Sequence, residues 1–135
     1  MTLVIDASAL VRAGVGTDVG AKELRTRLVA EDCHAPHLID AEVGDVLRRR
    51  ARRGKISSGL ARLVLREVSN LIDFRYAHTG EFATRAWELR ENLTIYDALY
   101  VALASSLNTV LITVDRQLAA VAEAACAVDL IADNV

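Results

Sequence analysis

The four residues "LVID" (residues 3–6) decide the fold, because a short and wholly apolar run ends directly at a carboxylate near the start of the chain. An apolar run without alternating polar residues is typical of a strand that is buried on both faces of a parallel sheet. A carboxylate at the end of such a strand is costly unless something offsets its charge. The wider stretch "VIDAS" (4–8) leaves two possibilities for Asp6: it caps the helix that follows, or it holds a ligand.

The rest of the chain alternates between strand-like and helix-like segments. The second clear apolar strand is "TVLITVD" (109–115), and shorter candidates lie at 33–36, 72–77 and 127–131. Periodic apolar residues predict helices at about 21–31, 38–53, 56–72, 79–91, 95–107 and 116–125, and a Gly-containing loop is expected at 14–20. Strands that alternate with helices favour an α/β fold with a mainly parallel sheet and right-handed crossovers. We therefore expect one α/β domain over residues 1–135.

Local signals predict where several of these helices begin and end. Gly54 is expected to end the 38–53 helix, and Asn108 to end the 95–107 helix. Ser57 or Ser58 is expected to cap the 56–72 helix, and Thr79 the helix at 79–91. The 95–107 helix is apolar nearly all round, which predicts that it is buried.

Composition limits the class of protein. The chain is 53% hydrophobic, yet no apolar run reaches the roughly 18 residues that span a bilayer, so we expect no membrane association. No basic leader precedes an apolar core at the N-terminus, and a cytoplasmic protein is the expectation. Cys33 and Cys126 are expected to be reduced thiols, and His34, His37 and His78 lack the spacing of metal ligands.

The charge is unevenly distributed, although the formal net charge is only −2. The run "RRRARRGK" (48–55) is strongly basic, whereas Arg116 is the one base among the acids that follow residue 90. Such a basic run is a candidate for contacts with a nucleic-acid backbone. It is equally well explained as a solvated helix end, where cations complement the helix dipole.

Four acids are expected near one another at the carboxyl ends of the strands, where α/β sheets bind their ligands. Asp6 and Asp115 end two strands, Asp97 lies in the first turn of the 95–107 helix, and Glu42 lies in the first turns of the helix after Pro36. Each has an ordinary explanation when taken alone. Asp6 and Asp115 can cap helices, Asp97 can complement a helix dipole, and Glu42 can be a solvated residue.

Taken together, the four acids favour a metal ion. At ~5 Å and an effective dielectric constant of ~20, each pair of carboxylates repels by about 3 kcal/mol. A cation offsets that cost, and an all-oxygen site without Cys or His suits Mg²⁺ or Mn²⁺. Asp40 and Asp45 flank Glu42 by two and three residues, and we expect them to point elsewhere as solvated acids.

Four segments resemble the PIN-domain ribonucleases, and more closely the VapC toxins of bacterial type II toxin–antitoxin pairs. They are "VIDASAL" (4–10), "PHLIDAEVGDVL" (36–47), "LTIYDALYVALA" (93–104) and "LITVDRQLA" (111–119). Their order and intervals fit the family over nearly the whole chain. The resemblance implies a PIN-like three-layer α/β/α sandwich with a short, mainly parallel central sheet.

The resemblance also implies a ribonuclease site. The family's catalytic, metal-binding acids match Asp6, Glu42, Asp97 and Asp115, and hydroxyl positions that often lie beside them match Ser8 and Thr113. The implied reaction is hydrolysis of an RNA phosphodiester with one or two Mg²⁺ or Mn²⁺ ions. Glu42 is expected either to bind a metal ion or to orient the attacking water. Some PIN domains carry a further acid directly after the position of Asp115, where Arg116 stands here, so the number of ions stays open.

The implied partners are an RNA substrate, a cognate VapB-like antitoxin that occupies the active-site groove, and a second copy of the chain in a homodimer. Candidate contacts to the RNA backbone are Arg48, Arg49, Arg50, Arg52, Arg53, Lys55 and Arg116. The apolar stripe of the 56–72 helix can serve a protein contact, or it can be part of the core.

Two alternatives are disfavoured by the sequence, and a third remains. A phosphorelay receiver domain needs a Lys at a late strand, but Lys22 and Lys55 both lie early in the chain. A haloacid-dehalogenase-type phosphatase needs an Asp where Ser8 stands. The strongest alternative is a catalytically inactive PIN-fold module that binds RNA or protein.

Overall fold

The computed structural model describes residues 1–133 of the chain. Its elements, in chain order, are β1 (Thr2–Ile5), α1 (Ala7–Val15), α2 (Val19–Ala30), β2 (Asp32–Pro36), α3 (Ile39–Arg52), α4 (Ser58–Ser69), β3 (Phe74–Tyr76), α5 (Glu81–Glu88), α6 (Ile95–Ser106), β4 (Val110–Thr113), α7 (Arg116–Ala122) and β5 (Ala127–Leu130).

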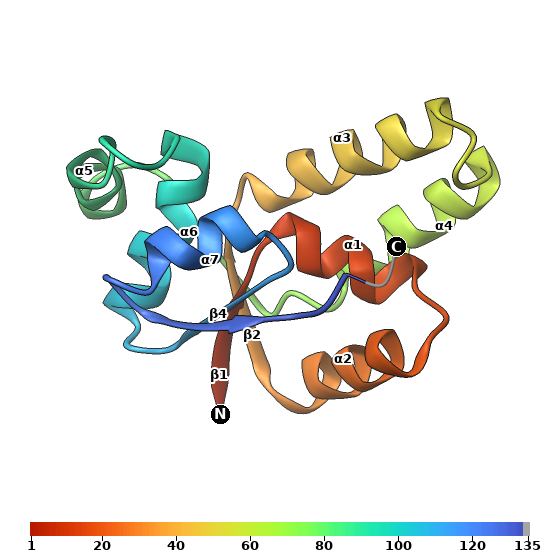
Figure 1. Ribbon diagram of the computed structural model, residues 1–135, viewed down its shortest axis with the longest axis horizontal. Coiled ribbons are helices and arrows are strands. Elements are labelled where there is room, and N and C mark those ends of the chain that lie inside the picture. The colour runs from red at the N-terminus through yellow and green to blue at the C-terminus, as the bar shows by residue number, and fades with distance from the viewer. Residues whose placement is uncertain (134–135) are drawn as a thin grey trace.

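The central sheet is parallel throughout, which confirms the α/β expectation. Its strand order is β3-β2-β1-β4-β5, and each neighbouring pair runs in the same direction. Helices cover both faces, with α1 to α4 on one side of the sheet and α5 to α7 on the other (Figure 1). Right-handed crossovers explain this division, because the chain moves outward from β1 to β3 and then returns to β4 and β5.

Successive strands are added on one side of β1 as far as β3, and β4 and β5 are then added on its other side. β1 pairs with β2 on one side and with β4 on the other, and Ile5 lies opposite Ile112. The backbone amide of Asp6 then donates to the carbonyl of Ile112 at 3.1 Å. The residues that follow these two strands therefore lie side by side at the topological switch point, where such sheets bind ligands.

The hydrophobic core lies on both faces of β1 and β4. Leu3, Val4 and Ile5 are fully buried, as the unbroken apolar run predicted. α6 is buried along its length, from Ala98 to Ala104, because it lies against three strands and also packs against α5. This burial fixes the position of the polar residues in its first turn.

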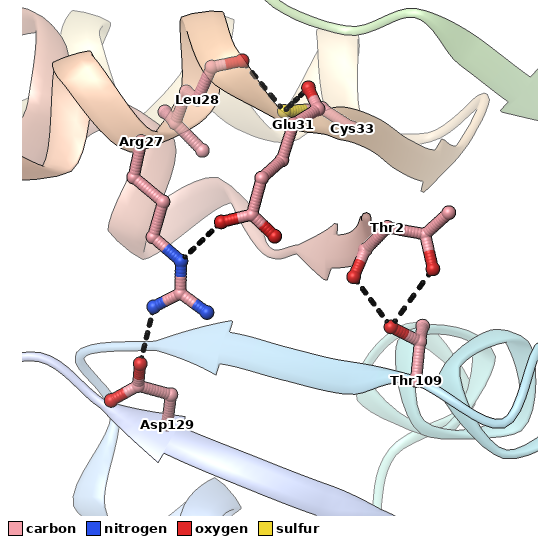
Figure 2. A network of polar contacts seen from close by, with 7 residues as sticks. All are labelled: Thr2, Arg27, Leu28, Glu31, Cys33, Thr109 and Asp129. Carbon is pink, nitrogen blue, oxygen red and sulfur yellow. Dashed lines mark hydrogen bonds and ion pairs between the residues drawn. The ribbon is translucent and has the colours of Figure 1, made fainter.

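Polar side-chain contacts link strands of the sheet to one another and to α2 (Figure 2). Arg27 donates to Glu31 at 2.9 Å and to Asp129 at 2.5 Å, which links α2 to β5. Thr109 donates through its hydroxyl to the carbonyl of Thr2 at 2.7 Å, which links the segment before β4 to β1. These contacts tie α2, β1 and β5 and the segment before β4 together.

The predicted loop at 14–20 is mostly helical, and only residues 16–18 connect α1 to α2. Gly14 lies inside α1 because that helix passes very close to α4. A Cβ added at Gly14 would stand 2.6 Å from Cγ1 of Val64 and 2.7 Å from Cγ1 of Val68. The glycine therefore serves helix–helix packing, and its presence does not mark a loop.

The predicted helix caps are confirmed in part. Ser57 caps α4, since its hydroxyl accepts from the amide of Leu60, and Gly54 follows α3 with a φ of 71°. Thr79 is not the cap of α5: that helix begins after Gly80, whose φ of 64° suits a residue without a side chain. A left-handed residue here turns the chain directly into the helix.

The apolar stripe expected on the 56–72 helix divides into two parts. Val64 and Val68 are buried against α1 and belong to the core. Leu60 and Leu63 are 40% and 49% exposed. α4 therefore supplies core residues on one face and presents leucines to solvent on another.

Two further expectations concern single residue types and the bilayer. Cys33 is buried, Cys126 is half-buried, and both are free thiols, as expected. Within residues 1–133, none of the helices has both the length and the apolar character needed to cross a bilayer.

Candidate active site

The four acids predicted from the sequence line one open pocket of about 310 Å³ at the switch point. Asp6 follows β1, Asp115 follows β4, Glu42 projects from α3 and Asp97 projects from α6. The pocket thus lies between helices on opposite sides of the sheet, and α3 and α6 flank the carboxyl ends of the strands (Figure 1). Residues more than 100 positions apart in the sequence meet here.

Asp6 is the most enclosed of these acids and is only 5% exposed. Its Oδ1 accepts from the hydroxyl of Ser8 at 2.6 Å and from the amide of Ala9 at 2.9 Å, and its Oδ2 accepts from the hydroxyl of Thr113 at 2.5 Å. Burial raises the pKa of the Asp6 carboxyl, these hydrogen bonds lower it, and the charge of Asp97 raises it further. Asp6 therefore caps α1 and also presents a costly carboxylate to the pocket.

The hydroxyls of Ser8 and Thr113 are themselves held by the backbone after β4. The amide of Val114 donates to Oγ of Ser8 at 3.2 Å, and the amide of Asp115 donates to Oγ1 of Thr113 at 3.0 Å. Each hydroxyl thus accepts from the β4 side and donates to Asp6. The network fixes the Asp6 carboxylate relative to both strands.

Asp115 also combines a cap with a place at the pocket. Its Oδ1 accepts from the amides of Gln117 at 2.9 Å and Leu118 at 3.1 Å, at the start of α7. The side chain is exposed and lines the pocket. The cap determines which way this carboxylate faces.

Asp97 stands in the first turn of α6, as predicted. The hydroxyl of Thr94 caps the helix by accepting from the amide of Asp97 at 3.2 Å. Burial raises the pKa of the Asp97 carboxyl, and the negative charge of Asp115 raises it further. The two acids are therefore close enough to repel each other.

Glu42 has a partner that the sequence did not identify. The hydroxyl of Tyr100 donates to Oε1 of Glu42 at 2.7 Å, across the pocket from α6 to α3. Burial raises the pKa of Glu42, the hydrogen bond from Tyr100 lowers it, and the charges of Asp97 and Asp6 raise it. The available signal was spacing, because Tyr100 lies three residues after Asp97 and so shares its helix face.

Asp45 lines the pocket, which corrects the expectation that it points elsewhere. It lies three residues after Glu42, and residues at that spacing share a helix face. Its carboxylate forms ion pairs with Arg48 at 2.9 Å and with Arg49. Asp40 lies outside the pocket and forms an ion pair with Arg75 at 2.7 Å, so neither acid is merely solvated.

The basic residues are less concentrated at the pocket than the sequence suggested. Of the seven candidate cations, which all fall within the described part of the chain, Arg49 is the one among the residues that line the pocket. Arg116 is exposed beside Asp115 but is not part of that lining.

The donors in the pocket are oxygens, and their mutual repulsion suits a hard divalent cation. Within residues 1–133, no three Asp, Glu, His or Cys side chains are already gathered around a single point suited to a metal ion. The four carboxylates fit such an ion by the chemistry of their oxygen donors and because they line the same pocket.

An α/β domain with a carboxylate-lined pocket at the switch point matches a known family. The PIN domain model matches residues 3–124, and the chain belongs to this family. Ribonuclease VapC1 of Mycobacterium tuberculosis is 44% identical over 128 residues, which cover 95% of this chain and 96% of that protein. The relationship therefore extends along nearly the whole length of both proteins.

Solved structures agree with this assignment. The crystal structure of PAE2754 from Pyrobaculum aerophilum is similar with a TM-score of 0.72 and 28% identity, covering 96% of this chain and 84% of that chain. VapBC2 from Rickettsia felis, crystallised with a DNA fragment from its promoter, contains a chain with a TM-score of 0.70 and 12% identity. That match covers 96% of this chain and 98% of the other, and it concerns the fold alone.

Proposed function

We propose that this protein is a metal-dependent endoribonuclease that acts as the toxin of a VapBC-type toxin–antitoxin pair. The observation that carries the proposal is the convergence of Asp6, Glu42, Asp97 and Asp115 on one pocket at the switch point. Kinship with VapC ribonucleases over nearly the whole chain supports the reaction class.

Asp6, Asp97 and Asp115 would hold the metal ion, and Glu42 completes the set as a ligand or as the group that orients the attacking water. Mg²⁺ is the proposed ion, and Mn²⁺ is the expected substitute because both prefer oxygen ligands. When bound, the ion supplies a Lewis acid for the phosphodiester oxygens.

The residues around the acids have positioning roles in this proposal. Ser8 and Thr113 hold both oxygens of Asp6, so that carboxylate cannot rotate away from the pocket. Tyr100 holds Oε1 of Glu42, which leaves Oε2 to accept a hydrogen bond from water. Because burial raises the pKa of Glu42, this carboxylate is a suitable proton acceptor in hydrolysis.

The partners follow from the same kinship and from the surface. A VapB-like antitoxin is the proposed protein partner, and the exposed Leu60 and Leu63 of α4 provide an apolar surface for it. RNA is the proposed substrate, attracted by the basic end of α3. The homodimer and the cytoplasmic location stay predictions, which sedimentation and cell fractionation measure.

A catalytically inactive module that binds RNA or protein is the second candidate. It is not favoured, because such a module has no need for four acids that repel one another in a single pocket. The raised pKa values of Asp6, Glu42 and Asp97 indicate that their arrangement costs stability without a cation.

The test is cleavage of total bacterial RNA by the purified protein. We expect cleavage with Mg²⁺ or Mn²⁺, none with a chelator, and a loss of about 100-fold or more in Asp97→Asn. Asp40→Asn is the matched control, since Asp40 is an exposed acid on α3 outside the pocket, and it should cleave as the wild type does. Equal rates for the wild type and Asp97→Asn would refute the proposed site.

A further inference from the structure

The pocket has a strong excess of negative charge. Asp45 adds a fifth carboxylate to the four predicted acids. Within residues 1–133, Arg49 is the one arginine that lines this pocket. A bound divalent ion offsets part of this charge, but an RNA phosphate brings a further negative charge. A phosphate that approaches the pocket therefore needs a cation at the rim.

Arg49 is in the right place because of its position on α3. Glu42, Asp45 and Arg49 are spaced by three and then four residues, and side chains at this spacing lie along one face of a helix. All three line the pocket. The other basic residues of the 48–55 run are not among the residues that line the pocket.

Asp45 determines where the guanidinium of Arg49 lies. Its Oδ1 accepts from Nε of Arg48 at 2.9 Å, and its Oδ2 accepts from Nη1 of Arg49. The contact occupies one nitrogen of Arg49 and leaves the rest of its planar fork of donors for phosphate oxygens. Both side chains remain about half exposed, so a substrate can reach them.

On this basis we propose that Arg49 contacts the RNA backbone phosphate at the pocket, and that Asp45 is a positioning residue that holds Arg49 there. The proposal rests on the proposed ribonuclease function. It assigns Asp45 a role only through its contacts with Arg48 and Arg49, and no role as a metal ligand.

The chain provides a closely matched control. Arg85 and Glu81 form an ion pair on α5 at 3.0 Å with the same spacing of four residues, and the Arg85 side chain is 44% exposed against 47% for Arg49. Arg85 is not part of the active-site pocket lining. A substitution there removes the same charge from the same kind of pair at a different place.

The first experiment measures binding without cleavage. A fluorescein-labelled single-stranded RNA oligonucleotide is titrated with protein in the Asp97→Asn background, at several salt concentrations. We expect Arg49→Gln to weaken binding about tenfold and to reduce the slope of log K against log salt by about 0.7, which is one phosphate contact on a single strand. Arg85→Gln should change neither quantity. Equal effects of the two substitutions, or no RNA binding at all, would overturn the proposal.

The second experiment tests positioning through a double-mutant cycle. Asp45→Asn should lower kcat for a cleaved RNA about five-fold without weakening RNA binding. The reason is that the positive charge of Arg49 remains near the pocket, but its guanidinium is no longer held in one position. In the Arg49→Gln background the same change should have no further effect on kcat. An equal loss in both backgrounds would overturn the positioning role.

The ribonuclease function and the phosphate contact of Arg49 can be refuted separately. If the wild type does not cleave RNA but Arg49→Gln still weakens binding, the proposed ribonuclease function is wrong and the phosphate contact stands. If the wild type cleaves RNA and Arg49→Gln matches Arg85→Gln in binding, the contact is wrong and the ribonuclease function stands. Thermal unfolding of each variant checks that it is folded.

Discussion

Substitution of Tyr100 by Phe removes one hydroxyl from the middle of the site. Tyr100 is 1% exposed, and its hydroxyl donates to Oε1 of Glu42 at 2.7 Å. A hydrogen bond to a charged group contributes about 1.5–3 kcal/mol to stability. Because Glu42 is only half-buried, water can replace part of this interaction. We therefore expect Tyr100→Phe to lower the free energy of unfolding by about 1–2 kcal/mol at neutral pH.

Urea denaturation of the metal-free protein measures this change. The hydrogen bond lowers the pKa of Glu42, so its contribution is present where Glu42 is ionised and shrinks as pH falls and Glu42 becomes protonated. Tyr96→Phe is the control, because Tyr96 lies one turn earlier on α6 and is 64% exposed. It should change stability by less than about 0.5 kcal/mol. A Tyr100→Phe variant as stable as Tyr96→Phe at neutral pH would refute the reasoning.

Two further predictions concern charge and packing. Burial and the charges of neighbouring acids raise the pKa values of Asp6, Glu42 and Asp97. The metal-free protein should therefore lose stability as pH rises from about 4 through these raised pKa values. Urea denaturation in the presence of a chelator measures this loss. Added Mn²⁺ should reduce that loss, and a stability that rises steadily over this range would contradict the assignment. Gly14→Ala should cost about 1–3 kcal/mol in thermal unfolding, because its Cβ would stand 2.6 Å from a valine of α4. Gly59→Ala, with nothing within 4 Å, should be neutral or slightly stabilising, and equal effects would refute the packing argument.

The fold was largely predictable because its main signals are local. The runs before Asp6 and Asp115 are mostly apolar, and strands of this kind are buried in parallel sheets. Adjacent parallel strands end at the same edge of the sheet. Because β1 and β4 are such neighbours, Asp6 and Asp115 lie close to each other. Glycines were the weaker signal: Gly14 is required by close helix packing, whereas Gly80 is required by its backbone conformation. The sequence alone does not distinguish these two reasons.

The parts of the site that escaped prediction depend on contacts between separate elements. Tyr100 lies in a helix that is apolar nearly all round, so the polar role of its hydroxyl is hidden until α3 brings Glu42 opposite. The expectation that Asp45 is a solvated acid is wrong, because its spacing from Glu42 places both side chains on one face of α3 and in one pocket. The composition of the basic run indicates RNA binding, but it does not show which residue of the run lies at the pocket. The orientation of α3 in the fold places Arg49 there. Local pattern predicts which elements form, and tertiary packing decides which of their side chains meet.

The central claim is that the carboxylates of this one pocket hold a divalent metal ion. Anomalous scattering from crystals grown with Mn²⁺ tests it most directly, since it locates the ion independently of activity. The expected result is an anomalous peak within the pocket beside the carboxylates of Asp6 and Asp97, and no such peak in crystals of Asp97→Asn. A wild-type map without a peak there, or with the ion bound only elsewhere, would contradict the account.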